Sequence, residues 1–501
     1  MTMTGRMSRF FLTLPCNFRN FLTNLKSTVV QDNYLKILIL LIITGLILRL
    51  WHIGDVGFWL DETLTNYYSH RTFIEIWHIG TDGVNPPTFY WIEHIVLYFG
   101  SGEAVLRLIP ALAGTCTIPV FYLLGREFHT RETGLVAAAL LTVSTFHIYY
   151  SQEARPYTLF LLCYSLALIF YLRAGKSSSG STWVLFGIFS ALSCWAHLFG
   201  FIFVFPLFLL ALLDKFFTGK TGIRDLKPLI LAGAIWILLS LPMLLVMIKA
   251  GLSKTATAEF WGLQGITLIT ATIHDEFGGY YVGIIILCIL FLVGLFRILL
   301  NDRKRFLFIA VTIAIPLSIT FILSFRMSIM PRYLIGLLPF LFLGISYALS
   351  SVHRRIYTVR FSCIAILLLI AISIPSLNLY YSADSRNSED WKGMAQGLQT
   401  LSGRQEVILV HPSFYTLPLI YYYNNHSAQT LVIGAKNKTD LEGLVKQYSD
   451  RKKMLIIVGK DKRDPAGEID QWINSHAELV EKYEELYLYS VSNPVNPAKS
   501  G

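Results

Sequence analysis

The sequence predicts a polytopic α-helical membrane protein that carries a soluble α/β domain in its C-terminal part. Of the 501 residues, 54% are hydrophobic and only 15% are charged, whereas soluble proteins average about 25% charged residues. The apolar residues form continuous runs, such as 35–50, 134–150 and 281–300, whose lengths suit a hydrocarbon core about 30 Å thick. These observations exclude a soluble enzyme, a disordered chain and a disulfide-rich secreted domain. A transmembrane β-barrel is excluded too, because the runs do not alternate.

About eleven apolar segments are expected to cross the membrane. They are 35–50, 104–125, 134–150, 156–172, 182–196, 199–213, 228–248, 281–300, 306–325, 333–350 and 361–379. The gaps between them alternate between Lys/Arg-rich and weakly charged, so the positive-inside rule places the basic gaps and the basic N-terminal tail in the cytoplasm. The segment 86–100 is short and contains Glu93 and His94. It is therefore expected to lie half-embedded at the outer face.

The composition changes after residue 380, where charged residues become frequent. Helical patterns at 389–401, 413–424, 439–449 and 467–476 alternate with apolar runs at 407–410, 430–433, 454–458 and 487–491, which predicts an α/β layer. The expected domains are a cytoplasmic tail over 1–34, a membrane domain over 35–380 with an outer loop at 52–103, and a periplasmic domain over 384–501. This last domain is expected to shape the entrance for an acceptor and to carry no catalytic group.

Charge and cysteine usage exclude several kinds of ligand. The net charge of +10 comes from Lys and Arg residues in the gaps between spans, without the basic, aromatic-rich stripe of a nucleic-acid interface. The predicted strands lack a glycine-rich phosphate loop, so no nucleotide cofactor is expected. The six cysteines match neither a zinc site nor a disulfide framework. Nucleic acid is therefore not an expected partner, whereas membrane lipids are.

Ionisable residues gather in the gaps that are predicted to face outward. Such groups cost free energy at a membrane boundary unless they are paired or hydrated, so each is a candidate for a functional site. They are Asp61 and Glu62 in the first outer loop, Glu153 and Arg155 in the next turn, His197, the run His274-Asp275-Glu276, and Arg326 and Arg332. Their concentration on one face suits a charged lipid headgroup and a proton transfer, whereas transporters usually place their sites near the midplane.

Each candidate also has a simpler structural interpretation that spacing alone leaves open. Asp61 could cap a helix over 62–69, with Glu62 at the positive end of that helix. Glu153 and Arg155 could form an interfacial salt bridge. Arg332 could extend to lipid headgroups or bind an anion through two parallel hydrogen bonds. His197 could be a packed histidine, and 274–276 could be either a solvated loop or part of a metal site.

Six motifs occur in an order that resembles a known family. They are Trp-Leu-Asp-Glu at 59–62, Asn-Pro-Pro-Thr-Phe-Tyr at 85–90, Leu-Arg-Leu-Ile-Pro-Ala-Leu-Ala-Gly at 106–114, Tyr-Ser-Gln-Glu-Ala-Arg-Pro-Tyr at 150–157, Ala-His-Leu-Phe-Gly at 196–200 and Pro-Arg-Tyr-Leu at 331–334. Over about residues 35–350 the chain resembles the integral-membrane glycosyltransferases of the C-type (GT-C) fold. Within them it is similar to glycosyltransferase family 39, the protein O-mannosyltransferases, and to the aminoarabinose–lipid A transferases. Asn85 and Pro156 depart from the usual motifs, which bears on substrate identity.

The resemblance implies an inverting transfer of a sugar from a polyprenyl-phosphate donor to an acceptor hydroxyl on the outer face of the cell inner membrane. The acceptor class, whether lipid, glycan or protein, is left open, as is a divalent metal. Asp61 matches the catalytic acid of the family and would act as general base. Glu62 and Glu153 would position the acceptor, the sugar or a metal. The implied substrate-binding residues are Arg155, Tyr157, His197, Arg326, Arg332 and Tyr333, and the arginines among them would stabilise the leaving phosphate.

Two other functional classes are compatible with the same span pattern. A transporter or lipid flippase could have a similar number of helices, and a non-catalytic assembly subunit could use its outer domain to bind partners. Loss of sugar transfer in an Asp61→Asn variant that is expressed normally would distinguish an enzyme from both.

Overall fold

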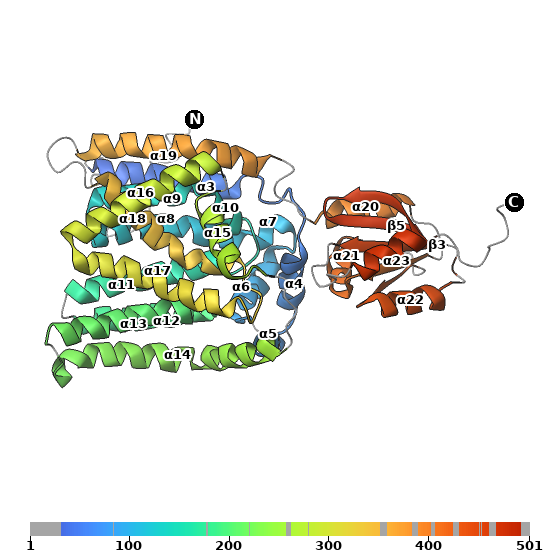
Figure 1. The fold of residues 1–501 in the computed structure, drawn as a ribbon, viewed down its shortest axis with the longest axis horizontal. Helices are drawn as coiled ribbons and strands as arrows, with labels where there is room; N and C mark the ends of the chain where they lie inside the picture. Colours follow the sequence, from blue (N-terminus) through green and yellow to red (C-terminus); the bar gives the residue numbers. More distant parts are fainter. Residues whose placement is uncertain are drawn as a thin grey trace, which may run out of the picture.

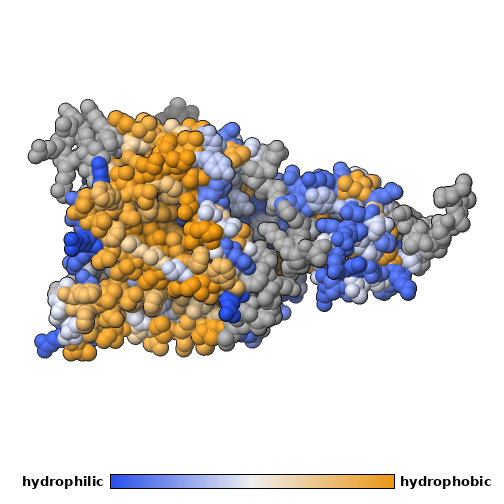
Figure 2. Space-filling view, viewed as in Figure 1, coloured by the Kyte–Doolittle hydropathy of each residue, from blue (hydrophilic) through white to orange (hydrophobic). Residues whose placement is uncertain are grey.

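The computed structural model consists of a helical membrane domain and a smaller α/β domain that follow one another along the longest axis (Figure 1). The structure describes residues 32–491, apart from 84, 177–178, 220, 257–261, 279, 351–357, 383–388, 402–405, 424–429, 450, 452 and 460–466. Figure 2 shows a broad hydrophobic surface on the helical domain and a mainly hydrophilic surface on the α/β domain. This division confirms the predicted fold class of a polytopic helical membrane protein with an α/β domain outside the membrane core.

Helices of the membrane domain coincide with all of the predicted spans. They are α3 (Asn33–Leu50), α7 (Glu103–Leu106) with α8 (Leu108–Phe128), α9 (Arg131–Val143) with α10 (Thr145–Ser151), α11 (Tyr157–Lys176), α12 (Gly180–Ala196), α13 (Gly200–Phe217), α14 (Ile223–Ala256), α16 (Tyr281–Asn301), α17 (Arg303–Leu323), η2 (Pro331–Leu337) with α18 (Leu338–Ser350), and α19 (Thr358–Tyr381). Within the described residues, nine spans are long and apolar enough to cross a membrane, and a bent pair could make a tenth. Helix α12 is apolar but has only 17 residues.

The predicted span 134–150 is not one straight helix, because α9 and α10 meet at an angle of 61°. Ser144 lies between them with extended backbone, and its hydroxyl accepts a hydrogen bond from the backbone N–H of His147. The break leaves carbonyl groups without helical partners, and the buried Arg49 donates to two of them, those of Leu141 and Thr142. The bend is therefore stabilised by a side chain from α3, a contact that periodicity does not reveal.

The outer loop folds into short helices at the end of the bundle beside the α/β domain (Figure 1). They are α4 (Leu60–Ser69), α5 (Phe73–Gly83), α6 (Thr88–Val96) and the 3-10 turn η1 (Leu97–Phe99). The predicted short helix at 86–100 corresponds to α6 and η1, and neither belongs to the candidate spans. A further short helix, α15 (Gly265–Glu276), lies between α14 and α16, in the gap between the predicted spans 228–248 and 281–300.

The α/β domain contains a five-stranded sheet with the strand order β2-β1-β3-β5-β4. Its elements are α20 (Trp391–Leu401), β1 (Glu406–His411), η4 (Ser413–Tyr415), α21 (Thr416–Tyr422), β2 (Leu431–Gly434), α22 (Lys438–Gln447), β3 (Lys453–Gly459), α23 (Glu468–His476), β4 (Ala477–Tyr483) and β5 (Leu486–Val491). Strand β1 is parallel to β2 and β3, whereas β5 is antiparallel to β3 and β4. Alternate residues of β1 and β3 belong to two separate hydrophobic clusters, as expected for a sheet covered on both faces.

Candidate active site

Several of the predicted outer-face residues converge at the end of the bundle that faces the α/β domain. Asp61 and Glu62 lie in the first turn of α4, which begins at Leu60 with Trp59 in the cap position. The alternative that Asp61 caps a helix over 62–69 is therefore wrong. The side chain of Asp61 is 22% exposed, whereas that of Glu62 is 1% exposed. Neighbouring side chains diverge on a helix, so the two carboxylates face different surroundings.

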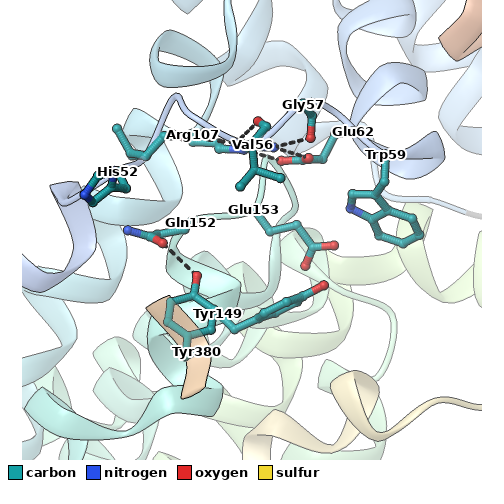
Figure 3. Close-up of a pocket in the computed structure, with 11 residues that line it drawn as sticks. His52, Val56, Gly57, Trp59, Glu62, Arg107, Tyr149, Gln152, Glu153 and Tyr380 are labelled. Carbon is teal, nitrogen blue, oxygen red and sulfur yellow. Dashed lines mark hydrogen bonds and ion pairs between the residues drawn. The ribbon is translucent and has the colours of Figure 1, made fainter. Parts of the chain in front are cut away.

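Glu62 is held by the buried Arg107, which is not among the site residues predicted from the sequence. Arg107 Nε donates to Glu62 Oε1 at 2.7 Å, and Arg107 Nη2 donates to Oε2 at 2.6 Å. The same guanidinium donates to the carbonyls of Ile53, Val56 and Gly57. The backbone N–H of Ala154 donates to Glu62 Oε1 at 2.8 Å. Glu62 and Arg107 therefore tie the outer loop to the turn after α10, and Figure 3 shows their bonds on one wall of a cavity.

Asp61 lies between two arginines from different segments, Arg155 in the turn before α11 and Arg332 in η2. Its Oδ2 is 3.4 Å from Arg332 Nη2 and 3.7 Å from Arg155 Nη2. Arg332 also lies over the rings of Trp59 and Tyr333, with 5.1 Å and 5.7 Å from its guanidinium carbon to the ring centroids. The Nε atoms of both arginines are buried and have no hydrogen-bond partner among the described residues. Each guanidinium thus has a spare donor next to Asp61.

The simpler interpretations of the arginines can be compared with these contacts. In the described part of the chain, Arg155 forms its ion pair with Asp61, and no salt bridge to Glu153 is present. Arg332 is 13% exposed and contacts Asp61, so its guanidinium is not extended toward lipid headgroups. Both side chains are directed inward, toward the same carboxylate.

Glu153 lies in the turn between α10 and α11, beside a cavity of about 40 Å³. Both of its carboxyl oxygens are buried and lack partners among the described residues. In Figure 3 its carboxyl group points toward the space between Trp59 and Tyr149. Burial, which outweighs the attraction of Arg332 and Arg155, raises the pKa of Glu153 to about 8. Near neutral pH the group is therefore mainly a neutral acid that can donate a hydrogen bond.

The turn that carries Glu153 and Arg155 is fixed by the glutamine that precedes them. The two N–H groups of Gln152 Nε2 are shared among the carbonyls of Trp51, Arg49 and Leu48 at the end of α3, at 2.7, 3.1 and 3.2 Å. The hydroxyl of Tyr380 on α19 donates to Gln152 Oε1 at 2.6 Å. All polar atoms of this side chain thus serve to join α3, α19 and the turn. Gln152 therefore has a structural role in the motif.

The raised pKa of Glu153 predicts a pH-dependent stability. A carboxyl whose folded pKa lies above its ordinary value of 4.5 stabilises the fold below that value, and the contribution is lost as pH rises through the folded pKa. We therefore expect Glu153→Gln to raise the melting temperature relative to wild type, by a margin that grows from about pH 5 to pH 8 and is constant above about pH 9. Thermal unfolding in detergent across this range is the measurement. The exposed Glu442→Gln is the control, and a pH-independent margin for Glu153→Gln would contradict the assignment.

Three aromatic residues from separate segments form a cluster next to the arginines. The ring centroids of His197 and Tyr333 are 5.6 Å apart, and those of Tyr157 and His197 are 5.7 Å apart. The backbone N–H of Phe199 donates to His197 Nδ1 at 3.3 Å. Burial, with the nearby Arg155 and Arg332, lowers the pKa of His197 to about 3. His197 is therefore a neutral imidazole in this wall, in keeping with either a packed residue or a substrate contact.

Other sequence candidates lie outside this cluster. Arg326 is exposed and makes no side-chain hydrogen bond or ion pair with the described site residues. Among the ion pairs of the described residues, His274 takes part in one, with its neighbour Asp275. Glu276 lines a separate cavity of about 20 Å³ beside Thr145. Across the described segments, no group of three or more His, Cys, Asp or Glu side chains could hold a metal ion.

The comparisons with known proteins agree with this architecture. The sequence profile of the dolichyl-phosphate-mannose-protein mannosyltransferase family matches residues 84–246, a region that includes Glu153, Arg155 and His197 but neither Asp61 nor Arg332. No curated protein matches the full sequence significantly.

Solved structures show that the chain has the GT-C fold. Apo ArnT from Cupriavidus metallidurans is 14% identical, with a TM-score of 0.58 over 90% of this chain and 97% of that chain. The same protein bound to undecaprenyl phosphate is 13% identical, with a TM-score of 0.57 over 92% and 99% of the two chains. The archaeal oligosaccharyltransferase AglB from Archaeoglobus fulgidus, in complex with an inhibitory peptide and a dolichol-phosphate, is 13% identical, with a TM-score of 0.51 over 93% and 75%. The expected GT-C fold is therefore confirmed.

Proposed function

We propose that this chain is an inverting glycosyltransferase that moves a sugar from a polyprenyl phosphate to an acceptor hydroxyl on the outer face of the membrane. The observation that carries the proposal is the placement of Asp61 between two largely buried guanidinium groups, Arg155 and Arg332, whose Nε atoms have no hydrogen-bond partner among the described residues. A carboxylate beside anion-binding donors is the combination that acceptor deprotonation and phosphate departure require. The undecaprenyl phosphate bound by the structurally similar ArnT supports this class of donor.

The reaction can be written with the groups present. The acceptor oxygen attacks the anomeric carbon, the bond from that carbon to the phosphate oxygen breaks, and the acceptor proton passes to the carboxylate of Asp61. The lipid phosphate leaves as an anion, which Arg155 and Arg332 stabilise. Their contacts to Asp61, at 3.7 and 3.4 Å, are longer than strong charge-assisted hydrogen bonds of about 2.7–2.9 Å. The guanidinium groups can therefore turn to a bound phosphate at low cost and release Asp61 for the acceptor.

The other predicted site residues have separate roles in this mechanism. Glu153 is largely protonated near neutral pH, so it serves as a hydrogen-bond donor to the sugar or the phosphate. Glu62, whose two oxygens accept hydrogen bonds from Arg107 and Ala154, positions Asp61 instead of touching substrate. Tyr157, His197 and Tyr333 form the aromatic wall against which the donor packs.

The charge pattern and the position of the site support one orientation of the membrane domain. In this proposal the tail 1–34 is cytoplasmic, residues 35–380 form the transferase domain, and residues 384–501 lie outside the cytoplasm. The site lies at the bundle end beside the α/β domain, where α4 is found (Figure 1). In this proposal that end faces the outer side of the cell inner membrane, so donor and acceptor meet there. A site at one membrane face favours group transfer over transport, for which a site near the midplane is typical.

Arg332 provides a direct test of donor binding. Because Arg332→Ala removes a charge-assisted contact to the phosphate, the affinity for undecaprenyl phosphate should fall roughly 10- to 100-fold. Lysine at this position should restore only part of the affinity, since a point charge cannot replace the planar guanidinium. Binding is measured with purified protein in detergent or nanodiscs. Arg71→Ala in the same outer loop is the matched control, and unchanged affinity in Arg332→Ala would reject the phosphate site.

A further inference from the structure

The α/β domain directly contacts the loop that leads into α4 and Asp61. Phe58 is fully buried in a small hydrophobic cluster, against which Tyr421 and Tyr422 of α21 pack. Two residues later, Leu60 packs against the core cluster of the α/β domain that contains Trp391. The loop at 57–60 is thus enclosed between the two domains immediately before Asp61.

Two backbone amides of this loop bind side chains of the α/β domain. The N–H of Phe58 donates to the hydroxyl oxygen of Tyr422 at 2.5 Å, across 364 residues of sequence. The N–H of Leu60 donates to Glu389 Oε2 at 3.1 Å, across 329 residues. The first turn of a helix leaves its N–H groups without helical partners, and Trp59 provides no side-chain cap for α4. Glu389 therefore supplies, from another domain, the carboxylate that a cap residue would normally provide.

Both of these side chains are themselves held in place. Glu389 Oε2 also accepts from Trp391 Nε1 at 2.9 Å, and its Oε1 accepts from the hydroxyl of Tyr415 at 3.2 Å. The hydroxyl of Tyr422 donates to Glu103 Oε1 at 2.9 Å. Glu103 belongs to α7, which directly precedes Arg107. The loop is therefore fixed by the α/β domain on one side and by the pair Glu62–Arg107 on the other.

The two domains approach each other closely at Gly57. A Cβ atom added at Gly57 would lie 3.3 Å from both Lys392 Cβ and the hydroxyl oxygen of Tyr422. Such contacts are tighter than most in folded proteins, so a side chain at position 57 would require its neighbours to shift by a few tenths of an ångström.

We propose that Glu389 and Tyr422 are positioning residues that set the orientation of Asp61 through the amides of Leu60 and Phe58. This inference rests on the proposed function. A displacement of about 1 Å at a reacting group can reduce turnover about 10²-fold, and Asp61 directly follows Leu60. Arg155, Arg332 and Tyr333 all belong to the membrane domain, so the α/β domain controls the chemical step while donor binding remains independent of it.

The test uses Glu389→Gln and Tyr422→Phe in the full chain. In Glu389, two oxygens accept hydrogen bonds from Leu60, Trp391 and Tyr415, whereas glutamine has only one acceptor oxygen. Phenylalanine at position 422 has no acceptor for the N–H of Phe58. Turnover, measured as release of undecaprenyl phosphate from a panel of its hexose and pentose esters, should fall roughly 10- to 100-fold in each variant. Affinity for undecaprenyl phosphate should stay within about twofold, and hydrogen exchange should become faster at Phe58 and Leu60.

Matched controls and a double-mutant comparison separate positioning from general destabilisation. Tyr421→Phe removes a neighbouring interdomain hydrogen bond, to the carbonyl of Ser101, without touching either loop amide, and Glu442→Gln is exposed; neither should change turnover. In an Asp61→Asn background, Glu389→Gln and Tyr422→Phe should cause no further loss, because residues that act through one group are not additive.

Each result decides one question. Normal turnover in both variants, losses that add to that of Asp61→Asn, or a parallel loss of lipid affinity would overturn the positioning role. If the wild type transfers no sugar, or if Asp61→Asn is fully active, the proposed function itself is rejected. In that case the hydrogen exchange still decides whether the α/β domain holds the loop: faster exchange at the two amides supports it, and unchanged exchange rejects it.

Discussion

Asp61→Asn should lower sugar transfer by roughly 10²–10⁴-fold while binding of undecaprenyl phosphate is preserved. Asparagine keeps the size of the side chain and one oxygen that can accept from Arg332, so the site should retain its shape. It cannot take up the acceptor proton at neutral pH, so the loss should appear in turnover and not in apparent donor affinity. Steady-state transfer and lipid binding, measured on the same preparation, give the two quantities.

Asp55→Asn is the matched control for this experiment, because it makes the same chemical change in the same loop at a residue whose side chain is 58% exposed. Near-normal turnover in Asp61→Asn would contradict the mechanism and require another acid as base. Glu153 would be the first alternative to consider. Its raised pKa makes it a weak candidate, because little of it is ionised and able to take up a proton at neutral pH. A pH–rate profile of Asp61→Asn that shows a single step near pH 8 would identify Glu153 as that base.

The membrane spans could be predicted from the sequence because each span is determined by a continuous local run of apolar residues. A continuous apolar run satisfies the length requirement of a bilayer by itself, and each predicted run proved to be helical. The bend at Ser144 could not be predicted, since it depends on donors from Arg49 on a different helix. Strand β4 was also missed because it lies at the edge of the sheet, where its exposed and charged sequence lacks an apolar run.

The candidate site was only partly predictable. Asp61, Arg155 and Arg332 were selected individually, and the order of motifs suggested that they meet; the structure places them around one carboxylate oxygen. The partner of Glu62 was missed, although a lone arginine at position 107 within an apolar run is a signal for a buried ion pair. Glu389 and Tyr422 had no such signal, because their function depends on backbone amides more than 300 residues away.

Arg107→Ala should destabilise the membrane domain by about 3–5 kcal/mol, the usual cost of removing one partner of a buried ion pair. Glu62 would remain as an uncompensated carboxylate that is 1% exposed, and the carbonyls of Ile53, Val56 and Gly57 would lose their donor. Thermal unfolding in detergent should therefore show a markedly lower melting temperature. The outer loop would also lose its attachment, so turnover should fall even at temperatures where the variant is folded.

The origin of this loss can be tested by changing the partner as well. If an unpaired charge is the main cost, Arg107→Ala combined with Glu62→Gln should be more stable than Arg107→Ala alone, because the remaining group is neutral. Arg173→Ala breaks the more exposed pair with Glu127 and should cost no more than about 1 kcal/mol. Should Arg107→Ala melt within the range of Arg173→Ala, the pair Glu62–Arg107 would not hold the loop, and the position of Asp61 would depend on the α/β domain alone.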